Sequence, residues 1–287
     1  MNLLKQSGRR FIPRYVRNWL RSPAQTAHWI WNEFQFGVGI KKSVEIRPGW
    51  NLVYHPAAFR LAYFAQQSDP DQVNEFDGFI GQCQMGMKLL DIGAHFGLFS
   101  LAALHYGGMN AKAVAVDPSP TACRIMRIQA SLNSVSYRLE ILQASVGSRV
   151  GWTDMVDSGI QSARYFVQPS DHAGRELTRT RSITLDALTE HLQDQPTHIK
   201  IDVEGCEEEV LLGAIATLSR TDGPLLFIEL HNQIVSERGG DPRKVLKILG
   251  ELGYDTVAPE GARLNHCEII SKPLIRVMAR KNSCSKP

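Results

Sequence analysis

Short apolar runs and longer amphipathic segments alternate along the chain from about residue 86 onward. The apolar runs predict strands at residues 87–93, 112–117, 139–145, 198–204, 224–230, 254–258 and 274–280. The segments with helical spacing predict helices at residues 97–106, 120–133, 184–193, 206–219 and 241–252. Strands and helices that take turns in this way favour an α/β domain, in which helices cover both faces of a mostly parallel sheet.

The pattern changes in two other parts of the chain. Upstream, residues 1–42 have a helical and basic pattern, residues 43–54 predict an extended pair, and residues 69–85 predict a helix. Residues 147–183 are rich in Gly, Ser and mixed polar residues, which predicts an inserted hairpin or loop region. No linker rich in Gly and Ser separates these parts. We therefore expect residues 1–68 to be a basic extension packed on or flanking a domain of residues 69–287.

The distribution of charge singles out the N-terminal segment. The chain of 287 residues has a net charge of +3, but residues 1–32 carry six basic residues and no acidic one, so the remainder has a net charge of −3. This segment could lie on an anionic membrane surface, contact a protein partner, or pack on its own domain with the arginines in water. No run approaches the roughly 20 apolar residues of a membrane-spanning helix, and charges interrupt the start of the chain where a signal peptide needs an apolar core. We therefore expect a cytoplasmic protein.

The stretch LDIGAHFGLFS lies where the first predicted sheet strand passes into a helix. It places Asp91 at the carboxyl end of the strand, followed by Gly93 and Gly97, which allow a tight turn and a close approach to the first amides of the helix. Asp117 ends the next strand, 20 residues after Gly97, where a carboxylate can accept hydrogen bonds from both hydroxyls of a ribose. These residues predict a cofactor that contains adenosine.

The charges of this site favour one cofactor of that kind. The loop after the third strand, with the small residues Ala144 and Ser145, is suited to flank an adenine ring. A dinucleotide site would have the pattern GxGxxG, but this chain has GAHFG, and Asp91 is a poor neighbour for a phosphate. S-adenosylmethionine carries an ammonium and a sulfonium and no phosphate, so Asp91 and Asp117 attract it. The P-loop pattern GxxxxGK[ST] is absent from the sequence.

Five motifs follow one another in the chain: LDIGAHFG, VAVDPSP, TLDAL, HIKIDVEGCEEEVLLGA and LFIELH. In this order they resemble the FkbM-type family of class I S-adenosylmethionine-dependent methyltransferases. The resemblance implies a Rossmann-like fold with a seven-stranded, mostly parallel sheet, and methyl transfer, usually to an oxygen of a small molecule or sugar. The family often has Asn at the position of His95, which leaves the role of this side chain open. We expect the cofactor to contact Asp91, Gly93, Ala94, His95, Gly97, Asp117, Pro118, Ala144, Ser145 and Asp202.

Charged residues gather where the fourth and fifth strands end. Alternation along the fourth strand turns Lys200, Asp202 and Glu204 to one side, where Lys200 and Asp202 could form a structural ion pair. Glu229 and His231 end the next strand in the same way. We expect His231 to be the general base that takes a proton from a hydroxyl, with Glu229 or Glu204 orienting it or the acceptor. Asp202 is a further catalytic candidate because it lies at the same edge of the sheet.

Other interpretations of these residues stay open. A lone histidine at a strand end is more often structural, and Glu207 and Glu208 suit the positive end of a helix dipole. The acids and His231 could hold a divalent cation, but they lack a dedicated ligand spacing, so a metal is possible and not favoured. Candidate acceptor-pocket residues are Tyr54, His55, His95, Phe96, Trp152, Tyr165 and Phe166.

The expected activity is O-methylation of a hydroxyl on a small molecule or sugar. A noncatalytic protein that uses the same fold to hold the cofactor or a partner is the main alternative. An NAD-dependent oxidoreductase is less favoured because of the GAHFG spacing. The small net charge and the absence of an NPPY-like tetrapeptide argue against a nucleic-acid partner.

Overall fold

The computed structural model of the chain describes residues 23–58, 69–157, 165–166, 177–192 and 195–282. The six basic residues near the N-terminus, Lys5 to Arg21, therefore lie outside the described residues. Within the described part, no helix is long and apolar enough to cross a membrane.

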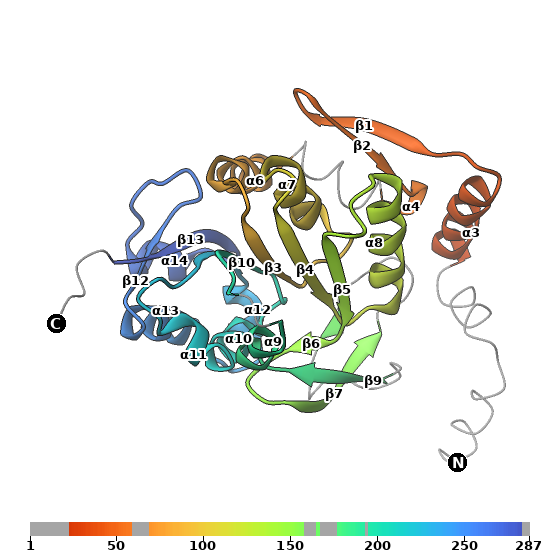
Figure 1. Cartoon of the computed structure of the whole chain (residues 1–287). Helices are drawn as coiled ribbons and strands as arrows, with labels where there is room; N and C mark the ends of the chain where they lie inside the picture. The colour runs from red at the N-terminus through yellow and green to blue at the C-terminus, as the bar shows by residue number, and fades with distance from the viewer. Residues whose placement is uncertain (1–22, 59–68, 158–164, 167–176, 193–194, 283–287) are drawn as a thin grey trace, which may run out of the picture.

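The centre of the molecule is a seven-stranded sheet with the order β12-β13-β11-β10-β3-β4-β5 (Figure 1). Its strands are β3 (Lys88–Ile92), β4 (Lys112–Asp117), β5 (Leu139–Gln143), β10 (His198–Ile201), β11 (Leu225–Leu230), β12 (Tyr254–Val257) and β13 (Ile275–Lys281). The pairs that join β5, β4, β3, β10 and β11 are parallel, and β13 runs antiparallel to both β11 and β12. The predicted seven-stranded, mostly parallel sheet is confirmed.

Each face of the sheet has its own hydrophobic core. One core joins the sheet to α6 (Pro70–Gln82), α7 (Leu98–Tyr106) and α8 (Pro120–Leu132). The other joins it to α9 (Leu185–Leu192), α10 (Glu207–Leu212), α11 (Ile215–Leu218), α13 (Arg243–Glu251) and α14 (His266–Ser271). Helices therefore cover both faces, which is the α/β arrangement predicted from the alternating pattern.

The helices differ from the sequence predictions in two ways. The helix predicted at residues 206–219 is broken into α10 and α11, because Gly213 lies against the chain at Gly147: a Cβ at Gly213 would be 2.1 Å from the Gly147 carbonyl oxygen. Two short helices, α12 (Asn232–Glu237) and α14, were not predicted. At the start of α14, the Asn265 side chain accepts a hydrogen bond from the Glu268 N–H at 2.7 Å, which is a standard N-cap.

The insertion at residues 147–183 contributes to a second sheet. This sheet has the order β6-β9-β7-β8, with β6 (Ser145–Val146), β7 (Gly151–Asp157), β8 (Tyr165–Phe166) and β9 (Leu177–Ile183). The pair β7 and β9 is antiparallel, whereas β6 pairs with β9 in parallel. Because β6 lies two residues after β5, the second sheet continues directly from the carboxyl end of the central sheet.

The N-terminal elements pack on the domain beside α8. They are α3 (Pro23–Gly37), the antiparallel pair β1 (Lys42–Arg47) and β2 (Trp50–Tyr54), and the single turn α4 (Pro56–Ala58). The Asn133 side chain, just after α8, accepts a hydrogen bond from the Val53 N–H at 3.0 Å and donates one to the Val53 carbonyl at 2.7 Å. Trp50 stacks on Phe76 of α6, with ring centroids 6.1 Å apart. Figure 1 shows α3 at the margin of the molecule, next to α4.

Candidate functional site

A cavity of about 1420 Å³ lies at the carboxyl ends of the central strands. It is bounded by the ends of β3, β4, β10 and β11, and by the start of the second sheet. Strand order reverses between β3 and β10, because the chain moves from β3 to β4 and β5 on one side and returns to β10 on the other. In parallel α/β sheets, ligands bind at this switch point.

The turn after β3 is held tightly against the end of β10. Asp91 is buried and accepts hydrogen bonds from the Ser100 N–H at 3.0 Å and the Ser100 hydroxyl at 2.6 Å. Burial raises the pKa of the Asp91 carboxyl, and the bonds from Ser100 oppose that shift. Gly93 has φ 80°, and a Cβ there would lie 1.8 Å from the Asp202 carbonyl oxygen. Glycine is therefore required at this position for both conformation and space.

Asp117 faces the same cavity from the end of β4. Its carboxylate is 3% exposed and accepts hydrogen bonds from the His95 N–H at 2.9 Å and the Ser119 N–H at 2.7 Å. Burial raises the pKa of Asp117 to about 7, even though these two hydrogen bonds act in the opposite direction. The negative charge of Asp91 adds to the shift. Asp91 and Asp117 thus lie close enough to interact at one cavity, as the sequence analysis required.

All but one of the predicted cofactor-binding residues line the cavity. Those that do are Asp91, Gly93, Ala94, His95, Asp117, Pro118, Ala144, Ser145 and Asp202. Gly97 does not line it; with φ 79° it starts α7, and a Cβ there would come within 3.1 Å of the Met126 side chain. His95 also has a left-handed backbone, with φ 52°, and its ring stacks on Phe96 at a centroid distance of 3.8 Å.

A buried network of four ionisable side chains supports one wall of the cavity, and burial raises the pKa of one of them, Glu75, to about 8. The Lys200 Nζ lies 2.9 Å from Glu75 Oε1 and 3.3 Å from Glu229 Oε1. Arg276 joins the same two carboxylates from β13, with Nε 3.0 Å from Glu75 Oε2 and Nη2 3.2 Å from Glu229 Oε2. Lys200 therefore pairs with Glu75 and Glu229, and not with Asp202 as the sequence allowed. Burial raises the pKa of Glu229, but the charges of Lys200 and Arg276 outweigh it and lower the pKa to about 2.

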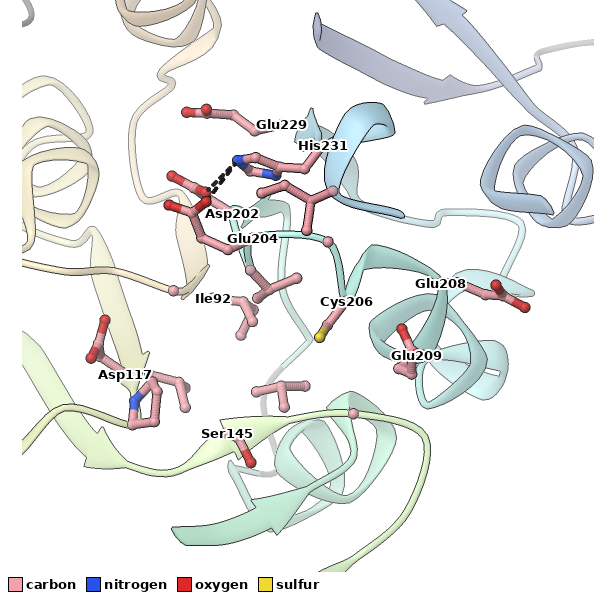
Figure 2. A pocket seen from close by; sticks show the side chains of 18 of the residues that line it. Ile92, Asp117, Ser145, Asp202, Glu204, Cys206, Glu208, Glu209, Glu229 and His231 are labelled. Carbon is pink, nitrogen blue, oxygen red and sulfur yellow. Dashed lines mark ion pairs between the residues drawn. The ribbon is translucent and has the colours of Figure 1, made fainter. Parts of the chain in front are cut away.

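His231, just after β11, presents its two ring nitrogens to different groups. Nδ1 lies 2.8 Å from Glu207 Oε1. Nε2 faces the cavity, 3.4 Å from Glu204 Oε2 and 3.8 Å from Asp202 Oδ1 (Figure 2). Burial lowers the pKa of His231, but the hydrogen bond to Glu207 and the charges of Glu207, Asp202 and Glu204 outweigh it and raise the pKa.

Glu207 is the site residue that the sequence analysis missed. It is 1% exposed, lies in the first turn of α10, and also accepts a hydrogen bond from the Gly205 N–H at 2.9 Å. From the sequence, Glu207 suits the positive end of the helix dipole, and Glu229 or Glu204 is the expected partner of His231. The sequence holds one indication of this contact. The helix α10 begins three residues after Glu204, so a carboxylate in its first turn stays near the end of β10.

The residues Asp202 and Glu204 complete this end of the cavity. Asp202 keeps 34% of its side chain exposed, yet burial and the neighbouring Glu229 carboxylate raise its pKa to about 7. Glu204 has φ 53°, a left-handed conformation that is uncommon for a residue with a side chain and is found often at functional sites. Both carboxylates point toward His231 in Figure 2, whereas Asp117 and Ser145 line a different part of the cavity.

Three side chains at this end have a spacing that a metal ion could use. One ligand atom from each of Asp202, Glu229 and His231 lies within 4.8 Å of the others. Glu229, however, is already neutralised by Lys200 and Arg276, so a cation there would compete with two buried positive charges. A metal at this site stays a possibility that the geometry does not favour.

The candidate acceptor-pocket residues separate into groups. His95, Phe96 and Trp152 line the cavity. Tyr54 and His55 are buried at the end of β2 and do not line it. The side chains of Tyr165 and Phe166 lie outside the described part of the structure. The candidates that remain lie at the glycine turn and at the second sheet.

The chemistry of the lining fits S-adenosylmethionine. Carboxylates outnumber cationic side chains along the cavity, and the cations Lys200 and Arg276 are already paired. A ligand that carries positive charge is therefore attracted, whereas a phosphate is repelled. The raised pKa of Asp117 indicates a buried carboxylate short of stabilising partners, and the two hydroxyls of a ribose would supply them.

Similar solved structures include a precorrin-6y C5,15-methyltransferase from Geobacter metallireducens, at 15% identity and a TM-score of 0.44, covering 76% of this chain and 92% of that one. They also include an O-methyltransferase from Bacillus cereus in complex with SAH, at 15% identity and a TM-score of 0.45, covering 79% and 86%. No curated protein matches the chain.

The family profile described as the Methyltransferase FkbM domain matches residues 91–256. This range is more than half of the chain and includes the glycine turn, Asp117, Asp202 and His231. The chain belongs to the FkbM family of S-adenosylmethionine-dependent methyltransferases.

Proposed function

We propose that the protein transfers the methyl group of S-adenosylmethionine to a hydroxyl oxygen of a small molecule or sugar. The observation that carries the proposal is the orientation of His231: one ring nitrogen is fixed by a buried carboxylate at 2.8 Å, and the other faces the cavity. A hydroxyl must lose its proton as its oxygen is methylated, and a base that is fixed in this way is suited to accept it.

In this proposal Glu207 is a positioning residue for the base. A carboxylate that accepts a hydrogen bond from Nδ1–H holds the neutral imidazole in the tautomer with a free lone pair on Nε2. After proton transfer the imidazolium lies beside Glu207, Glu204 and Asp202, whose negative charges stabilise it. The raised pKa of His231 follows from these charges and makes it a stronger base than a free histidine.

The other end of the cavity is assigned to the cofactor. S-adenosylmethionine supplies, when bound, an activated methyl group that leaves with no covalent help from the protein. Asp117 would accept the hydrogen bonds of the ribose hydroxyls, and the loop at Ala144 and Ser145 would flank the adenine. The contribution of the chain is then to align the acceptor oxygen with the methyl group and to exclude water.

The test begins with the acceptor. The purified protein is incubated with S-adenosylmethionine and a panel of hydroxylated small molecules and sugars, and products are screened by mass spectrometry for a gain of one methyl group. Calorimetry with S-adenosylmethionine and its demethylated product is run on the same protein. Tight cofactor binding with no methyl gain across the panel would support the noncatalytic alternative and contradict the proposal.

With an acceptor in hand, two variants test the base. His231→Gln is expected to lower kcat by about 10²–10⁴-fold while leaving cofactor affinity unchanged. In the wild type, kcat/KM should rise with pH through the raised pKa of His231, and Glu207→Gln should move this rise to lower pH, because it removes a charge that raises that pKa.

The matched control is Glu268→Gln, which changes a first-turn glutamate of α14 that lies outside the cavity. It should leave both the rate and the pH profile unchanged. A His231→Gln enzyme with near wild-type kcat, or a Glu207→Gln enzyme with an unshifted profile, would show that these roles are wrongly assigned.

A further inference from the structure

Helix α3 exposes an apolar face. Ile30, Trp31 and Phe34 are 58%, 56% and 56% exposed, and Trp31 stacks on Phe34 with a centroid distance of 5.7 Å. At about 100° per residue, these side chains fall within an arc of roughly 100° on one side of the helix. Val38 continues the stripe just beyond the last turn and is 57% exposed. An apolar stripe of this width normally faces a core, not water.

The opposite side of α3 packs on the domain through both aromatic and polar side chains, with the rings of Trp29 and Phe36 lying 6.5 and 4.5 Å from the ring of His55. Thr26 and Asn32 are 3% and 6% exposed. Glu33 forms an ion pair with Arg124 of α8, and its carboxylate lies 3.6 Å from the Nε2 of the buried His55. The helix is therefore fixed to the domain by one set of aromatic and polar groups, and it turns a second set of large apolar side chains outward. A surface helix in water is expected to be polar on its outer side.

The charge around this face is positive on both flanks along the chain. The 22 residues that precede α3 contain Lys5, Arg9, Arg10, Arg14, Arg17 and Arg21 and no acidic residue. Lys41 and Lys42 follow α3 and are exposed. The only acidic residue of α3, Glu33, is already paired with Arg124. Whatever contacts the apolar face must therefore also accept an excess of positive charge.

We propose that α3 and the basic segment before it bind the surface of an anionic lipid membrane. Apolar and aromatic side chains can enter the boundary of the acyl chains while lysines and arginines contact negatively charged headgroups. With 15 residues α3 is too short to span a bilayer, so it lies on the surface. A second copy of the chain is a poor occupant, because a symmetric contact at this face would bring two basic segments together.

The experiment is co-sedimentation of the full chain with vesicles. One set is phosphatidylcholine alone, and the other is an equal mixture of phosphatidylcholine and phosphatidylglycerol. Binding is expected to the anionic vesicles only, and to weaken as salt is added. The combined variant Ile30→Ser, Trp31→Ser and Phe34→Ser should bind at least about tenfold more weakly. Neutralising arginines at positions 9, 10, 14 and 17 with glutamine should cost about fivefold per residue.

A matched control keeps the test specific to this face. The double variant Met85→Ser and Met109→Ser removes two apolar side chains that are 77% and 71% exposed elsewhere on the surface, and it should bind vesicles as the wild type does. All variants are first checked for unchanged S-adenosylmethionine affinity by calorimetry, which reports an intact domain.

Three results would overturn the proposal. They are equal binding to neutral vesicles, wild-type binding by the triple serine variant, and no binding to either kind of vesicle. In the last case light scattering of the wild type and the triple variant decides the occupant, since a dimer that only the wild type forms would assign the face to a second copy.

Discussion

The ionisation of Asp117 makes a sharp prediction about cofactor binding. Its carboxylate is almost completely buried, and the hydrogen bonds from His95 and Ser119 do not fully compensate the loss of water, so its pKa is raised to about 7. Two ribose hydroxyls donate best to the ionised form, because protonation turns one of the two carboxyl oxygens into a donor. We therefore expect S-adenosylmethionine to bind the enzyme with a charged Asp117 and to release a proton from enzyme molecules in which Asp117 was neutral.

The size of the effect follows from the pKa. When binding requires the ionised form, affinity falls tenfold for each pH unit below the pKa, which corresponds to about 1.4 kcal/mol. With a pKa of about 7, the affinity at about pH 6 should be roughly tenfold lower than the plateau above about pH 8. The sign is fixed: affinity rises with pH, because the ligand competes with a proton.

Calorimetry in buffers of different ionisation enthalpy measures both the affinity and the protons released. A ligand with the ribose but no amino-acid part, such as 5′-methylthioadenosine, excludes titration of the ligand's own ammonium. Asp117→Asn should bind weakly and with no pH dependence in this range. Asp202 has a pKa raised to a similar value, so Asp202→Asn serves as the matched variant. It should keep a slope, moved to lower pH because the charge of Asp202 contributes to the raised pKa of Asp117. A wild-type affinity that is constant over this range, or a slope that survives in Asp117→Asn, would refute the reasoning.

Two further predictions concern the packing behind the site. Lys200→Met should destabilise the fold by about 3–5 kcal/mol in urea unfolding, because it removes one of the two cations that face the buried carboxyl groups of Glu75 and Glu229. The exposed Lys244→Met should cost less than about 1 kcal/mol. A small effect at Lys200 would show that the network is dispensable. Gly93→Ala should weaken cofactor binding more than about tenfold and destabilise the fold, because its Cβ would meet the Asp202 carbonyl oxygen. The control is Gly81→Ala in α6, which has open space around it and should be neutral or stabilising. Equal effects of the two substitutions would contradict this account.

The parts of the site that could be predicted from sequence are those fixed by strand ends. Parallel strands bring their carboxyl ends to one edge of a sheet, so Asp91, Asp117 and Asp202 had to meet once the strands were found. The same reasoning placed His231 at that edge. Alternation along the fifth strand also put Glu229 on the correct side, although its partners could not be identified.

The parts that could not be predicted depend on contacts between distant elements. Glu75, which pairs with Lys200, comes from α6, and neither periodicity nor spacing indicates which strand its carboxylate meets. The break at Gly213 has the same origin, because it depends on a close contact with the chain at Gly147 in the insertion. Glu207 was missed for a different reason: the helix-dipole explanation was sufficient locally, and it hid the contact with a histidine 24 residues later.

Asp202 connects the two ends of the candidate site. Its backbone N–H donates to the Ile92 carbonyl at 2.9 Å, and its carbonyl oxygen packs on Gly93 of the cofactor turn. Its side chain lies at the other end of the cavity, 3.8 Å from Nε2 of His231. Because one residue makes all of these contacts, the distance between the cofactor turn and the base is set by a single length of backbone. A substitution at Gly93 that displaces this backbone should therefore also lower kcat and shift the pH dependence that His231 controls, even at saturating cofactor. A Gly93→Ala enzyme that lost only cofactor affinity would show that the two ends are independent.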